Sequence, residues 1–334
     1  MVKKFKAGII GAGNIGFRYT LDPLRNWVSS HLQAYRKHQD FEPVAICDID
    51  GTKLREAKSY MPSLRVYASW REMLKNERID ILSVCVSPEI NFEVCVSPYF
   101  KNIKALILEK PFARNVSAGR RVIRILKEKK VVAAVNYFRR WQKTFWTAKD
   151  IIHSGKIGMI LKVNAFYPCG IWNGGSHMVD ALHFLLGNFD KIQALSRSDV
   201  PGSDDPLYSV FGHIGDIEVF LCGFKRKNFN IFDIEIWGRK GKIIISDYGK
   251  RIILQQALSS SRFSGQKELA VTKEIVIDKY NRYFLDLLDN ISGVLKNRET
   301  NVLCTPGEAL KTTRVIQAIE DSNKYEKEIS LTWR

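Results

Sequence analysis

Near its start the chain carries an apolar run followed at once by a glycine motif, and this combination limits the possible folds more than any other feature. The motif is Gly11-Ala12-Gly13-Asn14-Ile15-Gly16, which fits G-x-G-x-x-G, and Lys6–Ile10 before it is predicted to be a strand. In a strand–turn–helix unit the first glycine permits a tight turn. The second lets the backbone approach a pyrophosphate, and the third lets the helix pack on the sheet. The pyrophosphate then lies at the helix N-terminus, where free N–H groups favour negative charge.

The first 136 residues alternate short β-rich runs with helical stretches. The predicted strands are Lys6–Ile10, Pro43–Asp48, Ile81–Val86, Ala105–Leu108 and Val131–Val135. The predicted helices between them are Lys53–Tyr60, Trp70–Lys75, Phe92–Phe100 and Ala118–Lys129. Strand–helix alternation is typical of βαβ units, which build a parallel sheet covered by helices on both faces. We therefore expect an α/β fold in which residues 1–136 form a doubly wound, dinucleotide-binding Rossmann domain.

After about residue 150 the pattern changes to consecutive strands separated by turn residues. The predicted strands are Met159–Tyr167, Ile192–Ser196, Leu207–His213, Ile217–Phe224, Phe229–Trp237 and Lys242–Ser246, and helices return at residues 280–296 and 306–321. Phe232, Ile234 and Ile236 alternate with Asp233 and Glu235, which is typical of a sheet with one apolar and one polar face. We expect residues 137–334 to form an α+β domain on a mostly antiparallel sheet.

An acidic residue at the end of the second predicted strand bears on the choice of dinucleotide. Asp48 follows Gly16 by 32 residues (48 − 16), whereas the usual distance in this motif is about 20. The difference predicts an insertion around Leu21–Ser30, after which the helix resumes at His31 with a serine as its cap. The Asp48 carboxylate would bind the adenosine ribose and repel a 2′-phosphate, so we expect NAD rather than NADP.

A lysine stands just beyond the fourth predicted strand, at the sheet edge where doubly wound folds bind ligands. It belongs to Glu109-Lys110-Pro111, and proline favours extended backbone for the residue before it. In that place an ammonium group could hydrogen-bond a substrate hydroxyl or carbonyl and orient it. A solvated surface lysine is the other interpretation, because lysine is abundant in this chain.

A histidine and an aspartate lie three residues apart in a helix predicted to begin at Ser176. His177 and Asp180 are therefore neighbours on one helix face. Because histidine titrates near neutrality, His177 could relay a hydroxyl proton. A capping or surface pair is the alternative. We predict no metal site, since His177 and His183 are six residues apart and cannot share one helix face.

Composition narrows the class of protein without identifying it. The chain has 334 residues and a net charge of +17, and its length suits two domains. We expect no membrane span, because no apolar run is long enough, and a cytoplasmic location, because six scattered cysteines suit a reducing compartment. The charge has three interpretations: lysine bias, an anionic substrate, or nucleic acid. Nucleic acid is the weakest, because no recognition motif accompanies the charge.

Together these segments resemble the Gfo/Idh/MocA family of NAD(P)-dependent oxidoreductases, and the resemblance covers nearly the whole chain. It rests on the glycine motif, Ser87-Pro88 after the strand ILSVCV, Glu109-Lys110-Pro111, Asn136-Tyr137-Phe138-Arg139-Arg140, the helix with His177 and Asp180, and IEIWGRKGKIIISD in the second sheet. The resemblance implies a C-terminal substrate-binding domain whose large open sheet commonly serves contacts between copies. We therefore expect a homo-oligomer, a dimer or a tetramer, that associates through this sheet.

The resemblance also implies roles for single residues. Lys110 would orient the substrate and His177 would relay its proton. The implied substrate contacts are Asn173, Asp180, Tyr137 and Arg140, and the implied cofactor contacts are Gly11, Gly13, Asn14, Ile15, Gly16, Asp48, Ser87, Pro88, Glu109, Lys110 and Asn136. Two positions depart from the family: Asn173 stands where many members have aspartate, and Phe92 stands where members often have histidine.

The sequence thus predicts an NAD(H)-dependent oxidoreductase that acts on a secondary alcohol or ketone of a sugar, in particular a nucleotide-linked or otherwise anionic sugar. A free sugar or cyclitol dehydrogenase of the inositol dehydrogenase type is the close alternative. The departure at Asn173 motivates an alternative of another class, a catalytically silent NAD(H)-sensing regulator.

Overall fold

The computed structural model describes residues 4–200, 202–277 and 280–333, and the chain divides into two compact units. The first unit comprises Met1–Trp141 and Asn281–Leu310, and the second comprises Gln142–Tyr280 and Lys311–Arg334. Each unit has its own hydrophobic core.

The first unit is built on a six-stranded sheet in the order β3-β2-β1-β4-β5-β6, in which every pair of neighbours runs parallel. The strands are β1 (Phe5–Ile10), β2 (Phe41–Cys47), β3 (Arg65–Tyr67), β4 (Ile81–Val84), β5 (Ala105–Leu108) and β6 (Val132–Val135). The strand order reverses direction between β1 and β4, and this is the topological switch of a doubly wound sheet. The predicted parallel fold is confirmed. The edge strand β3 was not predicted, because it has three residues and none is buried.

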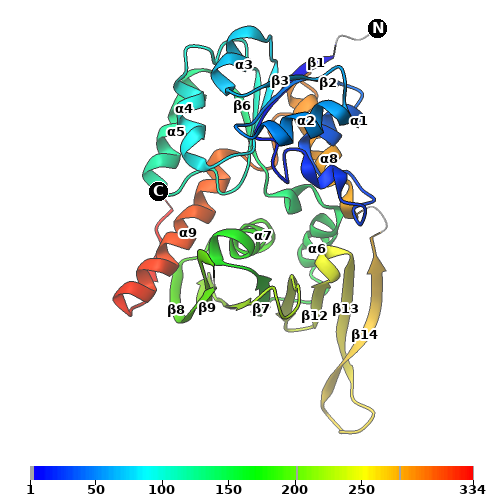
Figure 1. Ribbon diagram of the computed structural model, residues 1–334. Helices are drawn as coiled ribbons and strands as arrows, with labels where there is room; N and C mark the ends of the chain where they lie inside the picture. Colours follow the sequence, from blue (N-terminus) through cyan, green and yellow to red (C-terminus); the bar gives the residue numbers. More distant parts are fainter. Residues whose placement is uncertain (1–3, 201, 278–279, 334) are drawn as a thin grey trace. The chain divides into compact units, whose positions relative to one another are not determined.

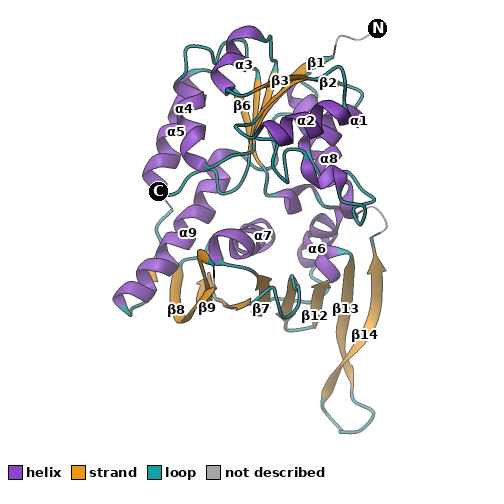
Figure 2. Cartoon of the chain, in the orientation of Figure 1, coloured by secondary structure: helices purple, strands orange, loops and turns teal. Residues whose placement is uncertain are grey.

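Helices cover both faces of this sheet (Figure 1). They are α1 (His31–Lys37), α2 (Gly51–Tyr60), α3 (Trp70–Asn76), α4 (Pro88–Val96), α5 (Val116–Glu128) and α8 (Tyr283–Leu295). Helix α1 packs on α8, and α4 packs on α5; Figure 2 shows these two pairs, in purple, on opposite sides of the strands. Helix α4 begins at Pro88 rather than at the expected Phe92, because proline suits the first helical position.

The segment 281–310 belongs to the first unit, whereas the sequence analysis placed it in the second domain. The physical reason is burial: α8 puts Phe284 and Ile291 into the core of the first unit. Asp40 adds a polar contact, because the Lys296 ammonium lies 2.6 Å from its carboxylate. Hydrogen bonding to Lys296 lowers the pKa of Asp40 below its usual value. Element order alone does not reveal that a late helix returns to an earlier core.

The second unit is built on a nine-stranded sheet in the order β14-β13-β12-β11-β7-β10-β9-β8-β15. The strands are β7 (Ile160–Pro168), β8 (Lys191–Val200), β9 (Ser203–Ile214), β10 (Ile217–Phe224), β11 (Asp233–Gly238), β12 (Gly241–Ser246), β13 (Arg251–Ser259), β14 (Lys267–Val276) and β15 (Ile329–Ser330). Only β7 and β10 pair in parallel among these neighbours. The large, mostly antiparallel sheet is confirmed, and so is the expected alternation in β11, where Ile234 and Ile236 are buried.

Helices α6 (Lys143–His153) and α7 (Ser176–Leu186) lie on one face of this sheet (Figure 1). The later part of α9 (Pro306–Tyr325) contributes Val315, Ile316 and Ile319 to the same core. Strands β13 and β14 continue past the end of β12 as a two-stranded hairpin (Figure 1). Association of copies through this sheet stays a prediction.

The described helices and the cysteines bear on two further expectations, which concern membrane spans and disulfide bonds. Among the helices of residues 4–200, 202–277 and 280–333, none is both long and apolar enough to cross a bilayer. All six cysteines are free thiols.

Candidate functional site

The glycine motif forms a tight turn between β1 and the first helical turn, as its spacing predicts. Gly11 has φ of 97°, a left-handed conformation that favours glycine, and its N–H donates to the Cys47 carbonyl at 2.8 Å. A Cβ at Gly16 would overlap the carbonyl oxygen of Gly11, whereas a Cβ at Gly13 would meet no heavy atom within 4 Å. Gly16 is therefore needed for packing, and Gly13 lies where the backbone stays open for a ligand.

Asp48 is attached to this turn. Its Oδ2 accepts the Ala12 N–H at 2.8 Å, and its Oδ1 accepts the Asp50 N–H at 2.9 Å. The carboxylate is thereby held beside the glycine motif, where an adenosine ribose is expected. Lys53 was not predicted as part of this site, although its Nζ lies 3.7 Å from Asp48 Oδ1. The signal was available, because Lys53 lies in the first turn of α2, five residues after Asp48.

The helix expected directly after the glycine motif is interrupted. One turn forms, with the Phe17 N–H donating to the Gly13 carbonyl at 2.9 Å, and the chain then leaves the helix. It returns at His31, whose N–H donates to the Ile15 carbonyl at 3.0 Å. The helical hydrogen-bond ladder thus continues across residues 19–30 as if they were absent, because the Leu32 N–H likewise donates to the Gly16 carbonyl. The predicted insertion is confirmed, although it begins earlier than Leu21. Ser30 caps α1, as expected.

The insertion (residues 19–30) is a self-packed loop. Thr20 and Ser30 hydrogen-bond at 2.6 Å and close its neck, and the Arg25 guanidinium lies 3.7 Å above the Tyr19 ring. Such compact loops with adjacent ends are frequently functional. The Arg18 side chain reaches α2 and pairs with Glu56 at 3.1 Å.

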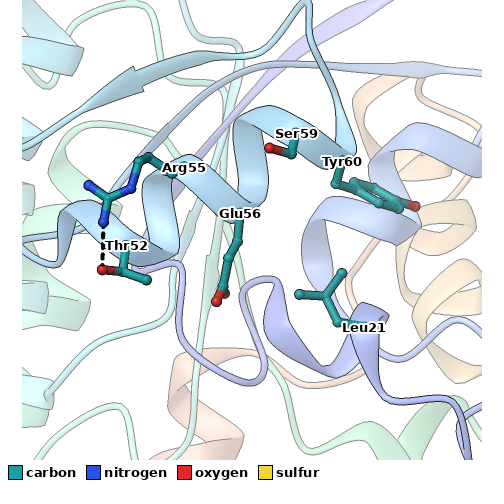
Figure 3. A pocket seen from close by; sticks show the side chains of 6 residues that line it. All are labelled: Leu21, Thr52, Arg55, Glu56, Ser59 and Tyr60. Carbon is teal, nitrogen blue, oxygen red and sulfur yellow. Dashed lines mark hydrogen bonds between the residues drawn. The ribbon is translucent and has the colours of Figure 1, made fainter.

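A hollow of about 430 Å³ lies between this loop and α2. Its lining is drawn in Figure 3 and consists of Leu21, Thr52, Arg55, Glu56, Ser59 and Tyr60. Arg55 folds back and donates to the Thr52 hydroxyl at 2.9 Å (Figure 3). The one cation in the lining is thus engaged within its own helix.

The carboxyl ends of β4, β5 and β6 bring together four further predicted residues. The Glu109 N–H donates to the Val84 carbonyl, and the Asn136 N–H donates to the Leu108 carbonyl, so both residues extend the parallel ladder. Asn136 Nδ2 donates to Glu109 Oε1 at 2.7 Å. Ser87 and Pro88 stand at the start of α4, immediately after β4. The glycine turn adjoins them, since a Cβ on Gly11 would lie 2.6 Å from the Cys85 carbonyl oxygen.

A buried hydrogen-bond chain leads from the sheet interior to Glu109. Tyr35 and Ser83 hydrogen-bond at 2.7 Å, and Ser83 contacts His31 Nδ1 at 3.0 Å. His31 Nε2 lies 2.8 Å from Glu109 Oε1. Burial raises the pKa of Tyr35 far above its usual value, so its phenol stays protonated. The His31 N–H also donates to the Ile15 carbonyl of the glycine turn. His31 therefore links the glycine turn to Glu109, the neighbour of Lys110.

Replacing His31 by alanine is expected to lower the free energy of unfolding by about 2–4 kcal/mol, measured by urea denaturation. The imidazole is 1% exposed, so its loss leaves Ser83 and Glu109 without this partner and opens a cavity against Phe284. Lys37→Ala, at the exposed end of the same helix, serves as the control and should change stability by less than about 0.5 kcal/mol. Equal stability of the two variants would contradict a structural role for His31.

Lys110 follows β5 and Glu109, is half-buried, and precedes Pro111 through a cis peptide bond. Two expected substrate contacts, Tyr137 and Arg140, are buried in the first unit, with exposures of 1% and 4%. Arg140 lies 3.6 Å from Glu308 and donates to the Leu303 carbonyl at 3.3 Å. The structure therefore gives Arg140 a part in holding segment 281–310.

The remaining predicted residues lie in the second unit. Ser176 begins α7 as predicted, and a π-helical turn, η3 (Ile171–Gly175), leads into it. Asn173 is exposed, His177 is half-buried, and Asp180 is only 1% exposed. Lys110 and His177 belong to different units.

A residue that the sequence analysis missed holds the loop before α7. Asp205, in β9, accepts the Trp172 N–H at 2.8 Å and the Asn173 N–H at 2.9 Å. Its carboxylate also lies where a Cβ on Gly170 would stand. No local pattern marks Asp205, because its partners are more than 30 residues earlier in the chain.

The N-terminal part of the chain matches the model of a known family. Residues 5–137 match GFO_IDH_MocA, described as an oxidoreductase family with an NAD-binding Rossmann fold. The match spans the glycine turn, Asp48, Glu109-Lys110-Pro111 and Asn136. Over residues 5–137, the chain is thus similar to the Gfo/Idh/MocA family. This match confirms, over these residues, the predicted resemblance to this oxidoreductase family and the predicted NAD-binding domain.

Curated relatives and solved structures extend the likeness to the second unit. Inositol 2-dehydrogenase of Salmonella typhimurium is 26% identical over 309 residues, which cover 87% of each chain. The WlbA dehydrogenase of Bordetella pertussis, solved with NADH and UDP-GlcNAcA, has a TM-score of 0.79 at 19% identity and covers 100% of this chain and 99% of its own. A super-repressor mutant of Gal80p from Saccharomyces cerevisiae has a TM-score of 0.78 at 16% identity, with 98% of each chain covered. At these identities the two structures support the fold alone.

Proposed function

We propose that this protein transfers hydride between NAD(H) and a secondary alcohol or ketone of a sugar or cyclitol. The observation that carries the proposal is the gathering of the glycine turn, Asp48, Glu109 and Asn136 at one edge of a parallel sheet, with Lys110 next in the chain. The relative named inositol 2-dehydrogenase supports a polyol as substrate.

The described residues fit a dinucleotide. The open position at Gly13 and the backbone N–H groups of the turn suit a pyrophosphate, and Asp48 suits the ribose hydroxyls. Ser87, Pro88 and Asn136 lie at the same edge, where they would hold the rest of the cofactor. When bound, NAD supplies the acceptor or donor of hydride.

The chain's own residues supply orientation and proton transfer in this proposal. Lys110 donates a hydrogen bond to the reacting oxygen of the substrate and orients it. His177 takes the hydroxyl proton during oxidation and returns it during reduction. Asn173 can donate and accept hydrogen bonds but carries no transferable proton, so the proton role falls to His177, with Asp180 on the same helix.

An NAD(H)-sensing regulator without turnover is the second candidate. The observation that favours it is Asn173, which stands where many family members have aspartate. The fold shared with the Gal80p super-repressor mutant is compatible with it.

The experiment that separates the candidates combines cofactor identification with a substrate panel. Mass spectrometry of the purified protein should find NAD(H) rather than NADP(H), because Asp48 disfavours a 2′-phosphate. With NAD⁺ added, NADH formation is expected with at least one member of a panel of myo-inositol, free hexoses, hexuronates and nucleotide-linked sugars. Tight NADH binding without turnover of any panel member would favour the regulator. Copurified NADP(H) would contradict the role given to Asp48.

A further inference from the structure

A cavity of about 360 Å³ in the second unit borders the segment that leads to His177. Its walls come from the carboxyl ends of β7 and β10, which run parallel and so end at the same edge, and from the start of β9. The lining residues are Cys169, Gly170, Asn173, Val200, Ser203, Asp205, Lys225, Arg226 and Lys227. The volume is within the range of small-molecule sites, roughly 300–1,000 Å³.

The floor of this cavity is fixed by short contacts. The Cys169 N–H donates to the Phe224 carbonyl at 3.2 Å, which ties the end of β7 to the end of β10. Cys169 itself has φ of 65°, and Gly170 leaves room for the Asp205 carboxylate. Asp205 in turn holds the Asn173 backbone. The loop that carries Asn173 is therefore held to β9 through Asp205, and the end of β7 is held to the end of β10 through Cys169.

The rim of the cavity carries three consecutive cations. Lys225, Arg226 and Lys227 follow β10 directly, and among the described residues none of them forms an ion pair. The one carboxylate in the lining, Asp205, already accepts two backbone N–H groups. The local charge is therefore positive, and ammonium and guanidinium groups are the usual partners of phosphates and carboxylates.

The lining residues fall into two groups, which could bind two different parts of one ligand. The cations would bind an anionic group, whereas Asn173, Ser203 and Asp205 present the polar oxygens and nitrogens that bind hydroxyl groups. A neutral cyclitol would use the second set and leave the three cations without a partner.

We propose that this cavity, the anion pocket, binds a phosphate or carboxylate group of the substrate, so that the substrate is an anionic sugar rather than a neutral sugar or cyclitol. This inference rests on the proposed function, which it narrows to one substrate class.

The test compares binding of three probes to the NAD-loaded protein by isothermal titration calorimetry: glucose 6-phosphate, glucuronate and glucose. At least one anionic probe is expected to bind about tenfold or more tightly than glucose, which corresponds to about 1.4 kcal/mol. The preferred anion tells a phosphate from a carboxylate site. The variant Lys225→Gln/Arg226→Gln/Lys227→Gln should lose this preference, and its residues lie on the cavity rim, outside the core.

A matched control removes the same number of charges elsewhere on the second unit. Arg239→Gln/Lys267→Gln/Lys273→Gln changes three exposed cations, one in the turn between β11 and β12 and two on β14, and should keep the preference for the anionic probe. Equal binding of all three probes, no binding of either anion, or equal loss in both triple variants would overturn the anion pocket. None of these outcomes affects NADH formation from a neutral sugar, so failure of the anion pocket is distinguishable from failure of the proposed hydride transfer.

Discussion

Replacing Lys110 by methionine is expected to lower kcat by roughly 10²–10⁴-fold while NADH binding stays close to that of the unchanged protein. Methionine keeps much of the length and the apolar stem of lysine but has no N–H donor. The reacting oxygen of the substrate would lose its orienting hydrogen bond, whereas the contacts proposed for the cofactor at the glycine turn and Asp48 would remain. The effect should therefore appear in turnover.

Steady-state kinetics with the substrate found in the panel, together with NADH titration by fluorescence, would measure both quantities. Lys104→Met is the matched control, because Lys104 stands at the opposite end of β5 and pairs with Asp80 at 2.9 Å. It should leave kcat nearly unchanged. Unchanged turnover in Lys110→Met would refute the assigned role. A parallel loss of NADH affinity would move Lys110 from the substrate to the cofactor.

Much of the first unit could be predicted because its signals are local. The run at β5 is buried at every position, as expected of a strand covered on both faces, and this leaves a continuous apolar segment in the sequence. The spacing of Gly11, Gly13 and Gly16 predicted the turn for the same reason, because Gly11 takes a left-handed conformation there and Gly16 packs against the carbonyl of Gly11, only five residues away.

The parts that were not predicted depend on contacts between distant segments. The return of the helix at His31 is determined by hydrogen bonds to Ile15 and Gly16 across the insertion. The placement of α8 is determined by the core that it completes, and Asp205 acts on a loop that precedes it by more than 30 residues. Strands β13 and β14 carry many exposed residues, so their apolar pattern is weak. The hydrophobic periodicity of a segment does not indicate which distant segment it will contact.

Gly16→Ala and Gly13→Ala are expected to weaken NADH binding for different physical reasons. At Gly16 the new methyl group would overlap the Gly11 carbonyl, a backbone atom that cannot rotate away, so the turn itself must move. We expect this variant to lose about 2 kcal/mol or more of unfolding free energy and most of its affinity for NADH. At Gly13 the methyl group meets no heavy atom within 4 Å, so stability should change by less than about 0.5 kcal/mol.

In Gly13→Ala the loss is confined to the cofactor, because the methyl group occupies space into which the pyrophosphate would approach the backbone. Its NADH affinity should fall by about tenfold or more, with no change in the urea midpoint. Gly307→Ala, in the first turn of α9, is the control, since its Cβ would meet only ordinary contacts. A Gly16→Ala protein as stable as this control would disprove the packing role of Gly16. A Gly13→Ala protein that binds NADH normally would show that the pyrophosphate does not approach the turn at this position.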